Sequence, residues 1–180
     1  MKFVRLAIAA VAFGAALLAA WPGAWGLANA ETPATTKLAP ALDGATRWLN
    51  SPPLTTQALR GKVVLVEFWT RECINCLHVL PHTKALYERY AADGLVVVGV
   101  HTPEYDEERD TGPLKDAIHT LGITYPVAMD NDYRIWNAYN NRFWPAIYLI
   151  DRDGHVVYRH IGEGDYDQTE ARIRQLLGKA

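Results

Sequence analysis

Continuous apolar runs in three parts of the chain predict buried β-strands. The runs cover residues 63–69, 95–100 and 146–150, and each is rich in branched aliphatic or aromatic residues. Such runs are typical of strands that are covered on both faces of a sheet. Between the first two, apolar and aromatic residues recur at helical spacing over residues 77–91. The order strand, helix, strand predicts a parallel pair joined by a right-handed crossover, and therefore an α/β fold.

Shorter patterns complete the predicted order of elements. The segment over residues 102–112 is polar and strongly acidic, and we interpret it as a solvated loop. The Asp153-Gly154 pair predicts a hairpin turn. The other expected elements are an edge strand at Trp48 and Leu49, a helix over 113–121 with Thr111 as a candidate cap, a strand over 125–129, a helical turn over 132–139, a hairpin strand over 155–161 and an amphipathic helix over 169–177.

The N-terminal 30 residues have the layout of a secretory signal peptide. Lys2 and Arg5 precede an apolar run over residues 6–20, and the small-residue pattern Ala28-Asn29-Ala30 follows. We expect cleavage after Ala30 and export to the periplasm. The run is shorter than the stretch of about 20 apolar residues that spans a membrane, and an uncleaved membrane anchor is the alternative.

A single domain is expected beyond this segment. Residues 31–41 are rich in Ala, Thr and Pro and predict a flexible lead-in to a domain over 42–180. The 150 residues that remain of 180 suit one domain with its own core. Because the segment 1–30 carries two positive charges and no negative ones, its removal changes the net charge from −2 to −4. A weakly acidic domain gives no electrostatic case for nucleic-acid binding.

The two cysteines of the chain, Cys73 and Cys76, form one Cys-x-x-Cys motif at the predicted strand-to-helix junction. A purely structural disulfide closing a ring of about four residues stabilises by only roughly 2 kcal/mol, which a domain of this size does not need. Cys73 is expected at the helix N-terminus, where free N–H groups and the helix dipole favour a nucleophilic thiolate. Cys76, one turn further in, is suitably placed to attack a mixed disulfide on Cys73 and release the product.

A metal site is the alternative use of this motif. Zinc sites normally need a second pair of Cys or His ligands, and no further cysteine is present. His78 and His82 are spaced to share a helix face, so a site built from Cys and His stays open. A copper-binding or copper-delivery module would use Cys73, Cys76 and His78, because soft thiolates and imidazole suit copper.

Three features in a fixed order make the chain resemble a known family. They are the segment Val66-Glu67-Phe68-Trp69-Thr70-Arg71-Glu72-Cys73-Ile74-Asn75-Cys76, then Pro81 in the following helix, then Trp144-Pro145 before a strand. Over residues 42–178 the sequence resembles the thioredoxin superfamily, and within it the exported bacterial proteins of the TlpA, ResA and DipZ kind. The resemblance implies a thioredoxin-like fold, with a central mixed β-sheet flanked by helices and an insertion after the second core strand.

The resemblance also implies roles for individual residues. Glu67 matches a buried acid that moves protons to and from the inner thiol, although a Glu reaching water from a strand edge is the alternative. Trp69 packs beside the active site in the family. Pro145 matches a cis proline opposite the cysteines, where the backbone of Trp144 pairs with bound substrate, and the alternative is a trans proline. Glu104 matches a Glu that influences the cysteines, with a solvated loop residue as the alternative.

The implied function is thiol–disulfide exchange with protein substrates, without a cofactor, by a reductant that receives electrons from a membrane donor. Two departures from thioredoxin bear on the redox potential: Ile74-Asn75 replaces Gly-Pro, and Glu72 replaces a Trp. The Glu72 carboxylate is expected to disfavour the Cys73 thiolate, and Arg71 to offset this in part. A peroxiredoxin-like peroxidase is the nearest rival, because residues 70–73 fit its Thr-x-x-Cys motif, but its expected Pro is absent.

Overall fold

The computed structural model describes residues 37–179, so the predicted signal segment 1–30 and the start of the lead-in lie outside the described residues. None of the helices within residues 37–179 is long and apolar enough to cross a membrane. The elements in chain order are β1 (Arg47–Leu49), β2 (Val63–Trp69), α1 (Ile74–Tyr90), η1 (Ala91–Asp93), β3 (Leu95–His101), η2 (Asp106–Arg109), α2 (Thr111–Thr120), β4 (Val127–Met129), α3 (Arg134–Ala138), β5 (Ala146–Ile150), β6 (Val156–Ile161) and α4 (Tyr166–Leu177).

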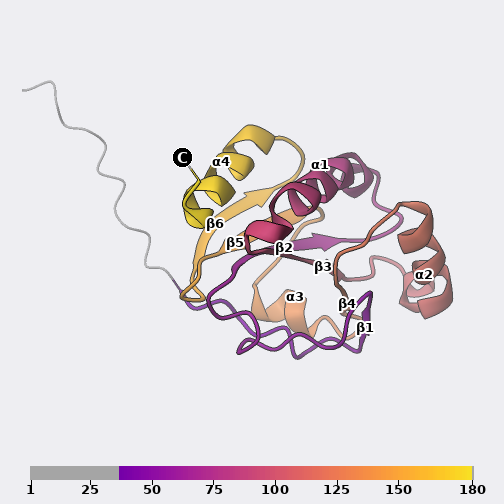
Figure 1. Cartoon of the computed structure of the whole chain (residues 1–180). Coiled ribbons are helices and arrows are strands. Elements are labelled where there is room, and N and C mark those ends of the chain that lie inside the picture. The colour runs from indigo at the N-terminus through magenta and orange to yellow at the C-terminus, as the bar shows by residue number, and fades with distance from the viewer. Residues whose placement is uncertain (1–36, 180) are drawn as a thin grey trace, which may run out of the picture. The chain divides into compact units, whose positions relative to one another are not determined.

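A six-stranded mixed sheet forms the centre of the domain (Figure 1). Its strand order is β1-β4-β3-β2-β5-β6, in which β2, β3 and β4 are parallel and the other neighbouring pairs are antiparallel. The central strand β2 lies between β3 and β5 and leads directly into the turn before α1. The predicted strands and the mixed sheet flanked by helices are therefore confirmed.

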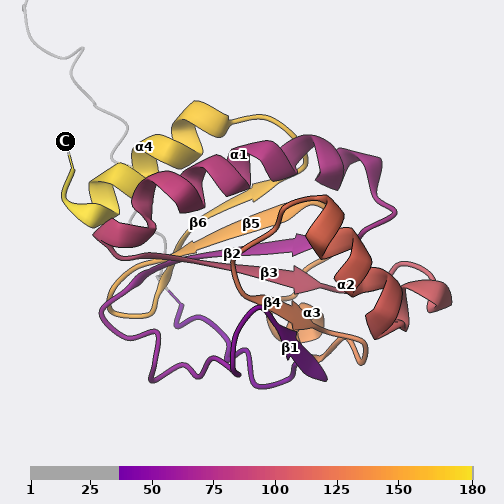
Figure 2. The ribbon, with the colours of Figure 1, turned by 45° about the vertical axis from the view of Figure 1, so that its right-hand side comes forward.

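Side chains of β2 alternate between two hydrophobic cores, which explains why the whole strand is apolar and buried. Leu65 and Trp69 pack in the core beneath α1, α2 and α4, whereas Val66 and Phe68 pack in the core that includes residues of α3. Figure 2 shows α1 and α4 over one face of the sheet and α3 on the other. By the same alternation, Glu67 points to the α1 face.

Two helices start at other residues than the sequence predicted. Thr111 is the first residue of α2 rather than its cap, and Asp110 occupies the N-cap without a side-chain hydrogen bond. α4 begins at Tyr166, three residues before the predicted start at 169. The residue before it, Asp165, is the N-cap, with a left-handed backbone (φ of 49°) and no side-chain hydrogen bond to the helix.

The described part of the predicted lead-in pairs with the β5–β6 hairpin. Leu38 forms a β-bridge with His155, and the Ala39 N–H donates to the Gly154 carbonyl at 2.8 Å. The Val156 N–H donates to the Lys37 carbonyl at 2.9 Å. Residues 37–39 are thus held against the domain by backbone hydrogen bonds, whereas the sequence predicted a flexible lead-in over residues 31–41.

Candidate functional site

The two cysteines form a disulfide at the N-terminus of α1, with their Cα atoms 5.2 Å apart. Because β2 ends at Trp69 and α1 begins at Ile74, Cys73 becomes the N-cap of the helix in an extended backbone conformation. The Cys76 N–H donates to the Cys73 Sγ at 3.3 Å. Cys73 is half-buried and Cys76 is only 2% exposed. The helix therefore supplies a hydrogen bond to the outer sulfur and shields the inner one, as the motif predicted.

Glu67 lies in the core beneath α1, where its side chain is 1% exposed. Its carboxylate accepts hydrogen bonds from the Thr83 hydroxyl at 3.1 Å and from the Tyr125 hydroxyl at 3.3 Å. Burial raises the pKa of Glu67 to about 7, and the two hydroxyl groups lower it only in part. A Glu reaching water from a strand edge is excluded, because β2 is an inner strand and the residue is buried.

Trp69 packs in the core below the turn that carries Cys73. A Cβ atom on Gly99 would lie 2.9 Å from the Trp69 Nε1, so only glycine lets the indole approach β3 this closely. The imidazole of His101 meets the Trp69 ring edge to face at 5.2 Å. Burial lowers the pKa of His101 to about 4, so this imidazole is neutral at pH 7. Trp69 is buried and supports the turn by packing.

The Trp144–Pro145 peptide bond is cis, as the resemblance implied. Trp144 is half-buried, and its Nε1–H donates to the Thr102 carbonyl at 3.1 Å. Trp144 and Cys73 both pack against the core beneath α1. The Thr102 N–H in turn donates to the Trp69 carbonyl at 3.2 Å, so Thr102 joins the end of β2 to the proline loop.

Glu108 corrects the prediction that the acidic segment 102–112 is a solvated loop. Its side chain is buried, and it accepts hydrogen bonds from the Thr70 hydroxyl and from the backbone N–H groups of Glu72, Glu104 and Tyr105. Burial alone would raise the pKa of Glu108, but these four donors outweigh burial and hold it below its ordinary value. No sequence signal marked it: Glu108 is the third residue of the η2 turn, but Tyr105, which precedes that turn, is not one of the Ser or Thr residues that announce a capping box.

The other charged residues near the motif are more exposed than Glu108: Glu72 and Glu104 are exposed, and Arg71 is half-buried. The side chain of Glu104 is exposed, and only its backbone N–H contacts Glu108. Arg71 pairs with Glu72 and also donates to the Glu107 carbonyl at 3.2 Å. The predicted partial neutralisation of Glu72 by Arg71 therefore has a direct structural basis.

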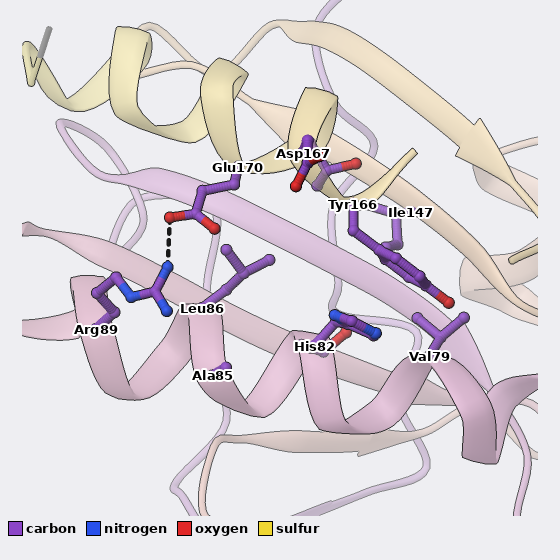
Figure 3. A pocket seen from close by; sticks show the side chains of 11 residues that line it. Val79, His82, Ala85, Leu86, Arg89, Ile147, Tyr166, Asp167 and Glu170 are labelled. Atoms are coloured by element: carbon purple, nitrogen blue, oxygen red, sulfur yellow. Dashed lines mark hydrogen bonds and ion pairs between the residues drawn. The ribbon is translucent and has the colours of Figure 1, made fainter. Parts of the chain in front are cut away.

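The histidines expected near the motif have other partners. His78 Nδ1 lies 3.2 Å from the Glu163 carboxylate, and His82 stacks on Tyr166 with ring centroids 3.6 Å apart. Figure 3 shows this stack between α1 and α4 among the side chains that line a pocket, with the Arg89–Glu170 ion pair further along α1. The pocket has a volume of about 200 Å³. Within residues 37–179, no three His, Cys, Asp or Glu side chains are grouped to hold a metal ion.

Comparisons with known proteins agree with this geometry. The Redoxin family model matches residues 27–177. DipZ of Mycobacterium bovis is 50% identical over 145 residues, which cover 79% of this chain and 21% of DipZ, so the chain spans about a fifth of that relative's length. The thiol-disulfide oxidoreductase YkuV of Bacillus subtilis is 29% identical over 140 residues, covering 78% of this chain and 94% of YkuV.

The fold comparison gives the same assignment. The crystal structure of a thioredoxin-like superfamily protein superposes with a TM-score of 0.73 at 31% identity, covering 79% of this chain and 97% of that one. The chain therefore belongs to the Redoxin family and has a thioredoxin-like fold, and it is similar to DipZ and to the thiol-disulfide oxidoreductase YkuV.

Proposed function

We propose that this protein is an exported thiol–disulfide oxidoreductase that reduces disulfides of protein substrates through Cys73 and Cys76. The observation that carries the proposal is the asymmetry of the pair. Cys73 is half-buried at the N-cap of α1 and receives the Cys76 N–H, whereas Cys76 is buried. An accessible, stabilised sulfur beside a shielded one is the arrangement that attack followed by intramolecular resolution requires.

In the reducing direction, the reaction has two steps. The Cys73 thiolate attacks one sulfur of the substrate disulfide, which forms a mixed disulfide and releases the other sulfur as a thiolate. Cys76 then loses its proton and attacks the Cys73 sulfur, so that the Cys73–Cys76 bond forms and the second substrate thiolate leaves. Two electrons pass from the dithiol to the substrate, and the substrate thiolates take up protons from water.

Glu67 is the residue that we assign to the proton of Cys76. It faces α1 and accepts from Thr83, which lies on the same buried side of that helix as Cys76. Its pKa of about 7 means that both the acid and the carboxylate are populated near neutral pH. A group with this pKa accepts a proton during reduction and returns it during the reverse reaction.

Substrate binding is assigned to the surface around the disulfide. Ile74, between the cysteines, is 61% exposed, and Phe143, just before Trp144 and Pro145, is 55% exposed. Exposed apolar side chains beside a reactive sulfur favour contact with unfolded or extended polypeptide rather than with a small polar thiol. The exposed carboxylate of Glu104 is included in this surface as its acidic member.

Export, a reducing role and a membrane electron donor complete the proposal. Support for export comes from the signal-peptide layout of residues 1–30. The similarity to YkuV supports thiol–disulfide exchange, and the reducing direction is proposed by analogy with the exported thioredoxin-like proteins that the sequence resembles. The reduction potential of the cysteine pair, measured in glutathione and dithiothreitol buffers, tests the direction. A value near about −270 mV supports a reductant, and a value near about −120 mV indicates a disulfide donor instead.

Serine variants test the chemistry itself. Cys73→Ser is expected to lower the rate of insulin disulfide reduction by at least about 1,000-fold, because the attacking sulfur is lost. Cys76→Ser retains attack and is expected to accumulate a mixed disulfide, which mass spectrometry of the substrate adduct detects. Full activity in Cys73→Ser, or fast peroxide consumption by the native protein without a thiol–disulfide substrate, would contradict the proposal.

A further inference from the structure

One buried carboxylate joins the turn before Cys73 to a second loop. Glu108 Oε1 accepts from the Thr70 hydroxyl and from the Glu72 N–H at 3.2 Å. Its Oε2 accepts from the Glu104 N–H at 2.7 Å and from the Tyr105 N–H at 3.1 Å. The first pair belongs to the turn after β2 and the second to the loop after β3. The two oxygens of one side chain therefore bridge the ends of two parallel strands.

The bridge needs an ionised carboxylate of this length. Each oxygen receives two donors, and a neutral amide or a protonated acid would place a hydrogen against at least one of them. The four hydrogen bonds keep the pKa of Glu108 low despite burial, so the group is an anion at pH 7. Thr70 also approaches His101 Nε2 at 3.4 Å, which closes the buried side of the turn.

We propose that Glu108 is a positioning residue for Cys73, which holds the Thr70–Glu72 turn so that Cys73 caps α1 within reach of Cys76. The inference rests on the proposed function. Cys73 directly follows Glu72, whose N–H donates to Glu108. The residues from Ile74 to Cys76 are held by their place in α1. Release of the turn would lower the effective concentration of one sulfur at the other, and thereby weaken the disulfide relative to the dithiol.

The test compares Glu108→Gln, Glu108→Asp and the matched control Glu107→Gln in glutathione buffers at pH 7. Gln keeps the size but loses an acceptor and the charge, whereas Asp keeps the charge but is too short to bridge both loops. We expect the equilibrium constant for the Cys73–Cys76 disulfide to fall about tenfold in both Glu108 variants, a rise of about 30 mV in potential. Glu107 is exposed, and its substitution is expected to change nothing.

The outcomes separate position from charge. If the equilibrium constant of the Cys73–Cys76 disulfide fell in Glu108→Gln but stayed native in Glu108→Asp, the effect would be due to charge, and the proposal would be overturned. Native equilibrium constants in both variants would overturn it as well. Thr70→Val removes one donor and keeps the carboxylate, so the equilibrium constant of the disulfide is expected to fall only about threefold. This variant replaces the Glu108 variants in the test if they do not fold.

Amide hydrogen exchange gives a second readout that does not depend on redox activity. The Glu72 amide is expected to be protected in the native protein and in Glu107→Gln, and to exchange at least about tenfold faster in the Glu108 variants. A freely exchanging Glu72 amide in the native protein would overturn the proposal. If the native cysteines formed no reversible disulfide, the proposed function would fail, and Glu72 exchange would still decide whether Glu108 holds the turn.

Discussion

Glu67 and Glu108 are both buried glutamates near the cysteine motif, yet their acidities move in opposite directions. Glu67 has two hydroxyl partners, at 3.1 and 3.3 Å, and burial raises its pKa to about 7. Glu108 has three backbone N–H partners and one hydroxyl, and its pKa lies below the ordinary value of 4.5. Because both side chains are buried, the number and kind of their hydrogen-bond donors decide whether each carboxyl is ionised near neutral pH.

The difference matches the position of each residue. Glu67 lies among apolar side chains of the sheet and α1, where few backbone donors are free because strands and helix already use them. Glu108 lies at the ends of β2 and β3, where two turns leave backbone N–H groups without partners. A regular core therefore produces an acid that titrates near neutral pH, and a loop junction produces a fixed anion.

The largest effect is expected from removing the fixed anion. Glu108→Ala leaves four buried or half-buried donors without their acceptor and is expected to lower the free energy of unfolding by about 4 kcal/mol at pH 7. Because the pKa of Glu108 is lowered by folding, its contribution is present above pH 4.5 and is lost as pH falls through the folded value. Urea denaturation should show that the difference in free energy of unfolding between Glu108→Ala and the native protein is smaller in acid than at pH 7. A loss below about 1 kcal/mol at pH 7 would contradict the assignment.

The titrating acid should behave in the opposite way. Folding raises the pKa of Glu67 from 4.5 to about 7, so the folded state keeps a proton that the unfolded state releases between these values. The contribution of the neutral Glu67 carboxyl to the free energy of unfolding is fully present below pH 4.5 and is lost as pH rises to about 7. Glu67→Gln is therefore expected to be more stable than the native protein by roughly 3 kcal/mol at pH 8, and equal to it near pH 4.5.

The same substitution should slow the reaction. Loss of the proton acceptor is expected to lower the rate of disulfide exchange about 100-fold at pH 7. Glu88→Gln, on the exposed side of α1, is the matched control for both measurements. If urea denaturation showed that Glu67→Gln gains no stability at pH 8, then the folded protein would not disfavour the ionised form of the Glu67 carboxyl.

A smaller effect is expected from one donor to Glu67. Tyr125→Phe keeps the buried ring but removes a hydrogen bond that lowers the pKa of Glu67, so the pKa should rise above about 7. Such a bond contributes about 1 kcal/mol, and the ionised fraction at pH 7 should fall several-fold. Stopped-flow measurement of resolution by Cys76 against pH should show the midpoint moving to higher pH. Tyr87→Phe, whose ring packs on Tyr125 at 5.7 Å, is the control and should leave it unchanged.

Local pattern predicted the framework of this site and missed the residues whose partners are distant in sequence. The apolar runs predicted β2 and β5 over their full lengths, and the Cys-x-x-Cys position followed from the end of β2. The burial of Glu67 stayed open, since one acid in an apolar run fits either a core or an edge. Glu108 was missed because its hydroxyl donor, Thr70, lies 38 residues earlier, and nothing in an acidic run distinguishes one member.

Glu107→Gln tests that last distinction and should give the smallest effect. Glu107 and Glu108 are adjacent in the same acidic turn, but Glu107 is exposed and only its carbonyl oxygen is used, by Arg71. Replacing the exposed carboxylate leaves this bond intact, so the free energy of unfolding should stay within about 0.5 kcal/mol of the native value. Urea denaturation of Glu107→Gln beside Glu108→Ala measures the contrast directly. Equal losses in the two variants would mean that the charge of the run, rather than the four donors around one carboxylate, stabilises the turn before Cys73.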